Sequence, residues 1–354
     1  MAEGLQTPLC RLLGIDWPVL SVGFGAGAGA ELAAAVSGAG GFGVLGATGM
    51  PPEFLHAECE RTRALTERPF GINVILAEDP HASAEELAED AAYYRSAIGA
   101  AAAGGASAVV LFWGDPAPYL GAAHESGQRV LIQVGSVDEA EAAVEAGVDA
   151  VIAQGIEAGG HIRGTTSIWE LLPSTVAAVA PTPVLASGGI GDGVGLARAL
   201  GLGAQGVSLG TRFVASDEAN VHPDYKARIV ASTAEDTVYT TDLYDVGWPH
   251  APHRTLRNRT YAEWEAAGCP EPGNRPGEGT AIGLRRYPWL DAQEWPRYAP
   301  GMATIAFDGE LDYAPMWAGE SCSLVDEIKP AGAIVHDLVR DATAALSYLP
   351  GPPS

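Results

Sequence analysis

The chain has few basic residues, few cysteines and no long apolar run. Its 354 residues include 20 Lys and Arg against 44 Asp and Glu, which gives a formal net charge of −24. Nucleic-acid grooves and anionic membrane surfaces are bound by clustered Lys and Arg. The composition therefore argues against both kinds of partner, and so much acid is typical of a solvated surface that favours solubility.

The four cysteines, Cys10, Cys59, Cys269 and Cys322, lie far apart and form no Cys-x-x-Cys pair. This spacing predicts reduced or buried thiols rather than a disulfide framework. No stretch approaches the length and apolarity of a membrane-spanning helix. The first residues lack the basic-then-apolar layout of a signal peptide, so we expect a cytoplasmic protein.

Short apolar runs recur along the first 215 residues, with room for a helix between most of them. The runs are 18–22, 42–45, 70–76, 108–112, 129–134, 150–153, 183–187 and 206–209. Continuous apolar runs of this length suit strands that are buried on both faces of a parallel sheet. Helices are expected at 31–38, 84–103, 137–146 and 194–200. Eight strands alternating with helices predict a (β/α)8 TIM barrel, while periodicity alone leaves an open doubly wound sheet as the alternative.

The pattern changes after the eighth run. Residues 216–322 are rich in Pro, Trp, Tyr and Arg and show little strand alternation, with one helix expected at 219–232. Helical spacing returns at 323–349. We therefore expect three parts: an α/β barrel over 1–215, a C-terminal lid region over 216–322 at the barrel mouth, and a helix within 323–354 that returns to the barrel.

The segment from Gln154 to His161 carries the strongest sign of chemistry. It follows the predicted strand 150–153 and ends in Gly159, Gly160 and His161. Glycine lets the backbone pass close to a ligand, and imidazole titrates near neutral pH. A parallel barrel builds its active site from loops of this kind at the carboxyl ends of its strands. His161 is therefore the candidate catalytic residue.

Two further glycine-rich loops follow the last two predicted strands. The first begins Ser187-Gly188-Gly189, and the second begins Gly210-Thr211. In a barrel these loops are neighbours, at a position that commonly binds a phosphate through backbone N–H groups. A Gly-Gly-Ile-Gly run alone is equally typical of a tight strand-to-helix turn, but the pairing of the two loops favours a phosphate site.

Together these motifs resemble the FMN-dependent nitronate monooxygenases, formerly called 2-nitropropane dioxygenases. The matching segments are 31–37 with 39–43, 69–73, 153–161, 186–190 through 210–213, and the shorter 318–321. FMN-dependent enoyl-acyl carrier protein reductases share the barrel and the Glu-Ala-Gly-Gly-His signature. The motifs are therefore more specific for the superfamily than for the reaction.

The resemblance implies a site for non-covalent FMN, with the phosphate at the two glycine loops and Asn73 and Gln133 near the flavin. Phe24 stands where the family usually has a Met-containing turn, and Arg163 stands where many relatives soon have a glycine; both are departures from the family pattern. The implied cofactor-binding residues are Phe24, Gly25, Asn73, Gln133, Gly159, Gly160, Ser187, Gly188, Gly189, Gly210 and Thr211, and no metal is expected.

The implied reaction is oxidative denitrification of alkyl nitronates, with O2 as oxidant and a carbonyl compound and nitrite as products. His161 would remove the α-proton of a neutral nitroalkane, or would only hydrogen-bond a nitro oxygen if the substrate arrives as the nitronate. The partners implied are thus a small-molecule nitronate or nitroalkane and O2. The oligomeric state, a homodimer included, stays open.

Two rival functions remain. An FMN- and NAD(P)H-dependent enoyl-thioester reductase would need a basic surface for an acidic carrier protein, to which a chain at −24 is poorly suited. Those reductases also tend to have glutamate where this chain has Gln154. The other rival is a flavin-binding protein without turnover, against which the intact His161 argues.

Other residues have ordinary interpretations. Glu157 is expected to accept backbone N–H bonds and so hold its own loop. His250 and His253 lie three residues apart without a third ligand nearby, which argues against a metal site. Most tryptophans are expected to pack within the lid, with one or two lining the substrate pocket.

Overall fold

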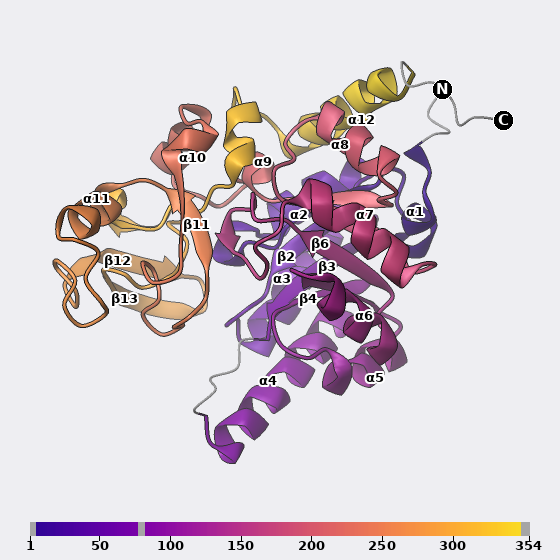
Figure 1. Cartoon of the computed structure of the whole chain (residues 1–354). Helices are drawn as coiled ribbons and strands as arrows, with labels where there is room; N and C mark the ends of the chain where they lie inside the picture. The colour runs from indigo at the N-terminus through magenta and orange to yellow at the C-terminus, as the bar shows by residue number, and fades with distance from the viewer. Residues whose placement is uncertain (1–4, 77–81, 348–354) are drawn as a thin grey trace.

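The computed structural model describes residues 5–76 and 82–347. Its larger part is a barrel of parallel strands surrounded by helices (Figure 1). The strands follow the hydrogen-bonded order β1-β9-β8-β6-β5-β4-β3-β2. Their bounds are β1 Val19–Ser21, β2 Gly43–Gly46, β3 Phe70–Ile75, β4 Ala108–Phe112, β5 Arg129–Val134, β6 Ala150–Gln154, β8 Val184–Ser187 and β9 Gly206–Leu209. Each coincides with one of the predicted apolar runs.

The two ends of this sheet meet at Phe42, just before β2. Leu20 of β1 and Phe42 form a parallel bridge. The Phe42 amide donates to the Val19 carbonyl at 2.9 Å, and the Ser21 amide donates to the Phe42 carbonyl at 3.1 Å. The ring of strands is therefore joined, and the predicted (β/α)8 TIM barrel is confirmed over the open sheet.

The barrel interior is packed, and its amino-terminal end is plugged. Leu131, Ile152 and Leu185 belong to one buried cluster with residues of helix α1, Pro8–Leu13. A Cβ placed on Gly206, where β9 begins, would lie 2.7 Å from the Leu9 side chain of α1. Because α1 occupies this end, we look for the ligand site at the carboxyl ends of the strands, where such barrels bind ligands.

The outer ring of helices is completed by a helix from the far end of the chain. The helices are α2 Ala30–Gly38, α3 Pro52–Leu65, α4 Ala84–Ala103, α5 Ala117–Glu125, α6 Val137–Ala146, α7 Ile168–Val179, α8 Gly193–Gly201 and α12 Ala331–Ser347. α12 packs against α8 on one side and α2 on the other. The bounds predicted for α4 and α6 are those observed, whereas α3, α5 and α7 were not singled out by the sequence.

An insert lies between β9 and α12 and stands to one side of the barrel (Figure 1). Its elements are α9 Thr211–Val214, α10 Pro223–Val230, β10 Thr237–Thr240, β11 His253–Leu256, α11 Arg259–Ala266, β12 Ala281–Tyr287, β13 Leu290–Pro296 and β14 Asp308–Gly309. In the described chain they form two three-stranded sheets, β10-β11-β7 and β13-β12-β14, in which β7 is Gly160–His161 of the barrel.

The sequence of this region shows little strand alternation, and the structure agrees, although strands do form there. β13 is exposed along most of its length, and β12 shows no regular alternation of buried and exposed residues. Neither strand therefore carries the period-two apolar pattern that reveals a half-buried strand. Their pairing is a tertiary feature without a local signal.

Two predicted helices are shorter than expected. The helix predicted at 219–232 is observed at Pro223–Val230, and the one predicted at 323–349 begins only at Ala331. Pro330 accounts for the second difference, because proline disfavours helical backbone in the residue before it. Residues 348 and 349 lie outside the described residues. Within those that are described, no helix combines the length and apolarity needed to cross a membrane.

The α8–α12 contact provides a test of how the last helix is held. A Cβ on Gly193 would lie 2.5 Å from the Ala342 amide nitrogen and 2.7 Å from the Leu338 carbonyl oxygen, both backbone atoms of α12. We expect Gly193→Ala to lower the free energy of unfolding by about 1–3 kcal/mol, because the helices must separate. Urea unfolding measures this change.

Gly201, on the same helix, is the matched control. A Cβ there has no described neighbour within 4 Å. Gly201→Ala should be neutral or slightly stabilising, within about 1 kcal/mol, through helix propensity alone. Equal losses for the two variants would show that close approach of the helices is not the cause.

Candidate active site

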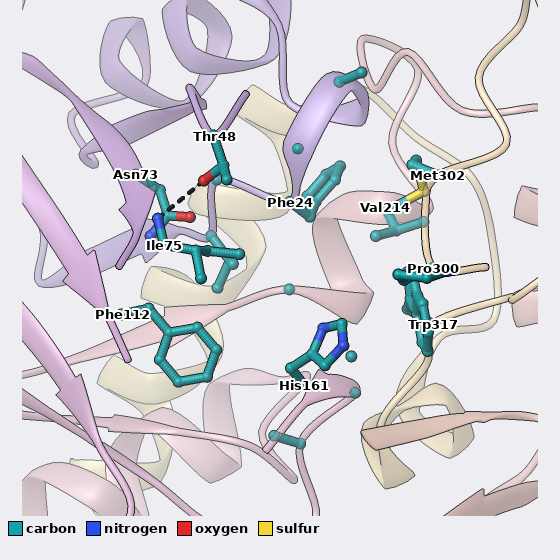
Figure 2. A pocket seen from close by; sticks show the side chains of 18 of the residues that line it. Phe24, Thr48, Asn73, Ile75, Phe112, His161, Val214, Pro300, Met302 and Trp317 are labelled. Atoms are coloured by element: carbon teal, nitrogen blue, oxygen red, sulfur yellow. Dashed lines mark hydrogen bonds between the residues drawn. The ribbon is translucent and has the colours of Figure 1, made fainter. Parts of the chain in front are cut away.

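A cavity of about 450 Å³ opens at the carboxyl ends of the barrel strands, between the barrel and the insert. This volume lies in the range of pockets that hold small ligands. Figure 2 shows His161 projecting into it, with Phe24 above, Phe112 on one side and Trp317 on the other. The expected site residues that line it are Phe24, Gly25, Asn73, Gln133, Gly159, Gly160, His161, Ser187, Gly188, Gly210 and Thr211.

Gly189 is not among the described residues that line the cavity. Its backbone is left-handed, with φ +69°, and a Cβ there would lie 3.1 Å from the Cβ of Glu157. Gly188 is also left-handed, with φ +94°, and a Cβ there would lie 2.9 Å from the Ala158 amide nitrogen. Both glycines let this loop pack tightly against the loop that carries His161, as a tight strand-to-helix turn would.

Aromatic rings surround the His161 imidazole. The Trp248 ring stacks on it, with centroids 4.0 Å apart and planes 29° from parallel. The Trp317 ring lies 5.4 Å from it, tilted by 44°. His161 Nε2 is buried and has no hydrogen-bond partner among the described residues. Because buried polar atoms are normally satisfied, this nitrogen is a candidate to bind a ligand.

Burial keeps the His161 imidazole uncharged. Desolvation, with a smaller contribution from nearby His253, lowers the pKa of His161 from 6.5 to about 3. An imidazole in this state has one N–H to donate and one nitrogen to accept a hydrogen bond. It holds an additional proton poorly, which weakens it as a general base near neutral pH.

The backbone of His161 is fixed from two directions. From the barrel, Gln154 at the end of β6 donates from Nε2 to the His161 carbonyl at 2.9 Å and accepts the Arg163 amide N–H at 3.1 Å. From the insert, β11 pairs antiparallel with β7, so that His253 faces His161 and Arg254 faces Gly160. The position of the ring therefore depends on both parts of the chain.

A second group of contacts holds the start of the same loop. The Arg254 guanidinium donates to the Ile156 carbonyl at 3.0 Å and forms a 3.0 Å ion pair with Glu320. The Glu320 amide donates to the Glu157 carbonyl at 2.9 Å. A Cβ on Gly159 would lie 2.4 Å from the Gly319 nitrogen, so only glycine permits this approach.

His253 is a structural residue. Nδ1 lies 2.9 Å from the Ala251 carbonyl, and Nε2 accepts the Tyr244 amide N–H at 3.2 Å with the Thr240 hydroxyl 3.0 Å away. These partners place the proton on Nδ1, and burial lowers the pKa of His253. Among the described residues, no group of three or more His, Cys, Asp and Glu is arranged to hold a metal ion.

Glu157 acts as expected from the sequence. Its carboxylate accepts the Ile168 amide N–H at 3.0 Å and the Ser167 hydroxyl at 2.5 Å. The predicted role of holding its own loop by accepting backbone N–H groups is confirmed. The carboxylate is engaged at the start of α7.

The departure at Arg163 has a clear structural role. Its guanidinium pairs with Glu139 at 2.6 Å and lies over the Trp113 ring, 4.6 Å from the centroid. Trp113 in turn meets Trp248 edge-on at 5.1 Å, and Trp248 stacks on His161. Trp113 holds left-handed backbone with φ 65°, a strained state for a bulky residue that tertiary contacts must maintain.

Several lining residues were missed by sequence reasoning. Phe112 ends a predicted strand, so its place at the barrel mouth follows from the strand pattern. The Thr48 hydroxyl accepts the Ile75 amide N–H at 2.9 Å (Figure 2) and had no motif to mark it. Trp248, Arg285, Tyr287, Trp289 and Trp317 come from the insert, whose path around the cavity has no local signal.

The barrel is closed and parallel, and the described wall of the cavity at its carboxyl end carries glycine loops and one imidazole, His161. With an insert covering it in part, this is the architecture of a ligand-binding barrel enzyme. The nitronate monooxygenase family model matches residues 6–341. A nitronate monooxygenase of Paraburkholderia phytofirmans is 30% identical over 381 residues, covering 96% of this chain and 96% of that protein. The chain therefore belongs to the nitronate monooxygenase family.

Other relatives carry different names. A (3aS,4S,5R,7aS)-5-hydroxy-7a-methyl-1-oxo-octahydro-1H-indene-4-carboxyl-CoA dehydrogenase of Mycobacterium tuberculosis is 34% identical over 264 residues, 74% of this chain and 69% of that protein. The structure of FabK from Thermotoga maritima is 33% identical with a TM-score of 0.78, covering 97% of each chain. A nitroalkane oxidase of Streptomyces ansochromogenes is 26% identical with a TM-score of 0.72, covering 96% of this chain and 100% of that one. Family membership makes the protein a flavin-dependent oxidoreductase.

The low pKa of His161 predicts a distinct titration. The folded imidazole should stay neutral down to about pH 3, whereas the unfolded one takes up a proton near its ordinary value of 6.5. The unfolded state then binds more protons between these values, so His161 makes stability fall as pH decreases through this window. NMR of labelled imidazoles, assigned with His161→Asn, follows the titration directly.

The same variant checks the linkage. Unfolding of His161→Asn, measured at several pH values, should show a shallower loss of stability between pH 6.5 and 3 than the unmodified protein. A His161 signal that titrates near 6.5 would contradict burial as the controlling factor.

Proposed function

We propose that the protein binds FMN at the barrel mouth and oxidises alkyl nitronates with O2 to a carbonyl compound and nitrite. The observation that carries the proposal is the neutral His161, whose buried Nε2 faces the cavity without a partner. A neutral N–H donor suits a substrate that arrives already as an anion. Family membership supports the same reaction class.

The cavity wall fits a flavin at two backbone positions. Gly25 and Gly160 have φ +59° and +73°, and a Cβ on either would have no described neighbour within 4 Å. These stretches of backbone face open space, where a flat ring can approach them closely. The expected phosphate ligands, Gly188 from one loop and Thr211 from the next, line the same cavity.

When bound, FMN supplies the redox chemistry, and the chain supplies position and a dry site. Asn73 and Gln133, from β3 and β5, line the barrel side of the cavity and are proposed to meet the flavin ring. Asn73 is itself oriented, because its Nδ2 donates to the Val110 carbonyl at 3.0 Å. Phe24 projects into the cavity across from His161 (Figure 2), and is proposed to cover the ring.

His161 is proposed to donate a hydrogen bond from Nε2 to a nitro oxygen of the substrate. Its lowered pKa argues against the alternative of proton abstraction from a neutral nitroalkane, because a base works best when its pKa lies near the operating pH. The donor role requires only that the ring stay neutral. Gln154 and β11 set its direction by fixing the backbone on which the ring stands.

Residues 216–322 are proposed to act as the lid of this site, with 1–215 as the FMN-binding barrel and 323–354 as the returning helix. The insert contributes Trp248 and Trp317 to the wall around His161. Apolar rings there exclude water, which strengthens hydrogen bonds to a charged substrate inside. The protein is proposed to act on small molecules.

A second candidate is an FMN- and NAD(P)H-dependent reductase of an enoyl thioester. The similarity to FabK and to the CoA dehydrogenase favours it. Against it stands the net charge of −24, which disfavours an acidic carrier protein as partner. The two candidates differ in their electron donor, and this difference can be measured.

The deciding experiment is anaerobic mixing of the flavin-loaded protein with propyl-2-nitronate or with NADH and NADPH. We expect the nitronate to bleach the oxidised flavin absorbance and the nucleotides to leave it unchanged. The neutral compound 2-nitropropane, at a pH where it has not ionised, should act far more slowly. Bleaching by NADH or NADPH, but not by the nitronate, would contradict the nitronate proposal and favour the reductase.

The role of His161 is tested by a pair of variants. His161→Phe keeps a ring against Trp248 but has no hydrogen-bond donor, whereas His161→Asn keeps a donor without the stacking. We expect His161→Phe to lose roughly 10- to 100-fold in kcat/KM for the nitronate, the value of one hydrogen bond to a charged group, and His161→Asn to lose less. Both should retain flavin. A larger loss for Asn than for Phe would assign the effect to packing.

A further inference from the structure

The charge distribution in the cavity wall is unlike that of the rest of the chain. The protein has 44 acidic residues, yet none of the described residues that line the cavity is Asp, Glu or Lys. Arg285 is the one lining residue, among those described, with a permanent charge. A single guanidinium in a wall without carboxylates is a positive site that no protein group neutralises locally.

Arg285 differs from the buried arginines of the insert. Arg254, Arg275 and Arg297 each pair with a carboxylate, on Glu320 at 3.0 Å, Asp245 at 2.6 Å and Glu263 at 2.8 Å respectively. No carboxylate in the described part of the chain lies within ion-pair distance of Arg285, and its Nε is buried with no hydrogen-bond partner. A buried donor on a charged group is costly to leave unpaired, so the arrangement calls for an anion from outside the chain.

The residues around Arg285 indicate which part of a ligand would lie beside its anionic group. Arg285 stands on β12 next to Tyr287, which stacks on Trp289 with centroids 5.3 Å apart and planes 13° from parallel. Burial raises the pKa of Tyr287, in spite of the opposing effect of the Arg285 guanidinium, so its hydroxyl stays neutral. Leu290 continues this apolar wall. The subsite therefore combines one cation with an apolar, aromatic surface.

We propose that Arg285 binds an acidic group, a carboxylate or a phosphate, carried by the substrate, and so selects substrates with an anionic group in addition to the reacting one. The proposal rests on the proposed function. Arg285 comes from the β12–β13 hairpin of the insert, whereas the expected cofactor phosphate site lies on barrel loops around Gly188 and Thr211. A guanidinium suits the role because it offers paired donors that match either oxyanion.

The test compares two variants on the same strand. Arg285→Gln removes the cavity charge, and Arg286→Gln makes the same change at the adjacent residue, which is exposed and does not line the cavity. The probes are the nitronates of 4-nitrobutanoate and 4-nitrobutanamide, which differ in the charge of the remote group. We expect Arg285→Gln to raise KM for the carboxylate roughly 10- to 100-fold with little change for the amide. Arg286→Gln should change neither.

Binding is also measured without turnover, by quenching of tryptophan fluorescence. The ligands are 4-nitrobutanoate and 4-nitrobutanamide in their neutral nitroalkane forms, before loss of the α-proton, and they are added anaerobically. This readout separates the two proposals: if the unmodified protein does not oxidise nitronates, selective weakening of carboxylate binding in Arg285→Gln still supports the anion site. Flavin content distinguishes the source of the anion. Loss of FMN from Arg285→Gln would assign the residue to the cofactor phosphate and overturn the proposal, as would equal weakening of both probes or no change in either.

Discussion

The antiparallel pairing of β7 with β11 is the contact on which the candidate site depends. It joins Gly160–His161, at the mouth of the barrel, to His253–Leu256, in the insert. His161 has no long strand of its own to stand on, and the Gln154 side chain supplies the only barrel contact described for its carbonyl. His253 contributes by keeping β11 in place, since both its nitrogens are used within the insert. The insert is thus a structural part of the active site and more than a cover over it.

Residues 318–321 help to hold the loop that leads into β7. Gly159 and Gly319 approach until a Cβ on either would overlap the other's backbone. The Gly319 amide also donates to the Thr211 hydroxyl at 3.0 Å, which ties this segment to the last barrel loop. Three loops far apart in sequence are therefore held by backbone groups and glycines. Such contacts transmit position accurately, because backbone atoms have few alternative arrangements.

Sequence reasoning recovered the features that are local. Strands buried on both faces, such as 129–134, appear as continuous apolar runs, and the end of each run marks the barrel mouth, where Asn73 and His161 were found. It failed where position depends on tertiary pairing. β12 and β13 lack alternation because one of them is largely exposed, and Arg285 could not be placed without their hairpin. Gly189, for which the resemblance implies a cofactor role, does not line the described cavity, and that role stays a prediction.

The cavity has two polar ends, one at His161 and one at Arg285, and they differ in charge. Burial among Trp248 and Trp317 keeps His161 neutral, so this end of the cavity offers a hydrogen bond but no charge. Among the described lining residues, the single permanent charge is Arg285, from the insert. If His161 were protonated, two cations would share an apolar cavity, and an anion could bind at either end with little discrimination. In the proposed function a neutral imidazole removes that ambiguity: Arg285 would orient the substrate, and the reacting group would meet a donor whose strength is increased by the dry surroundings.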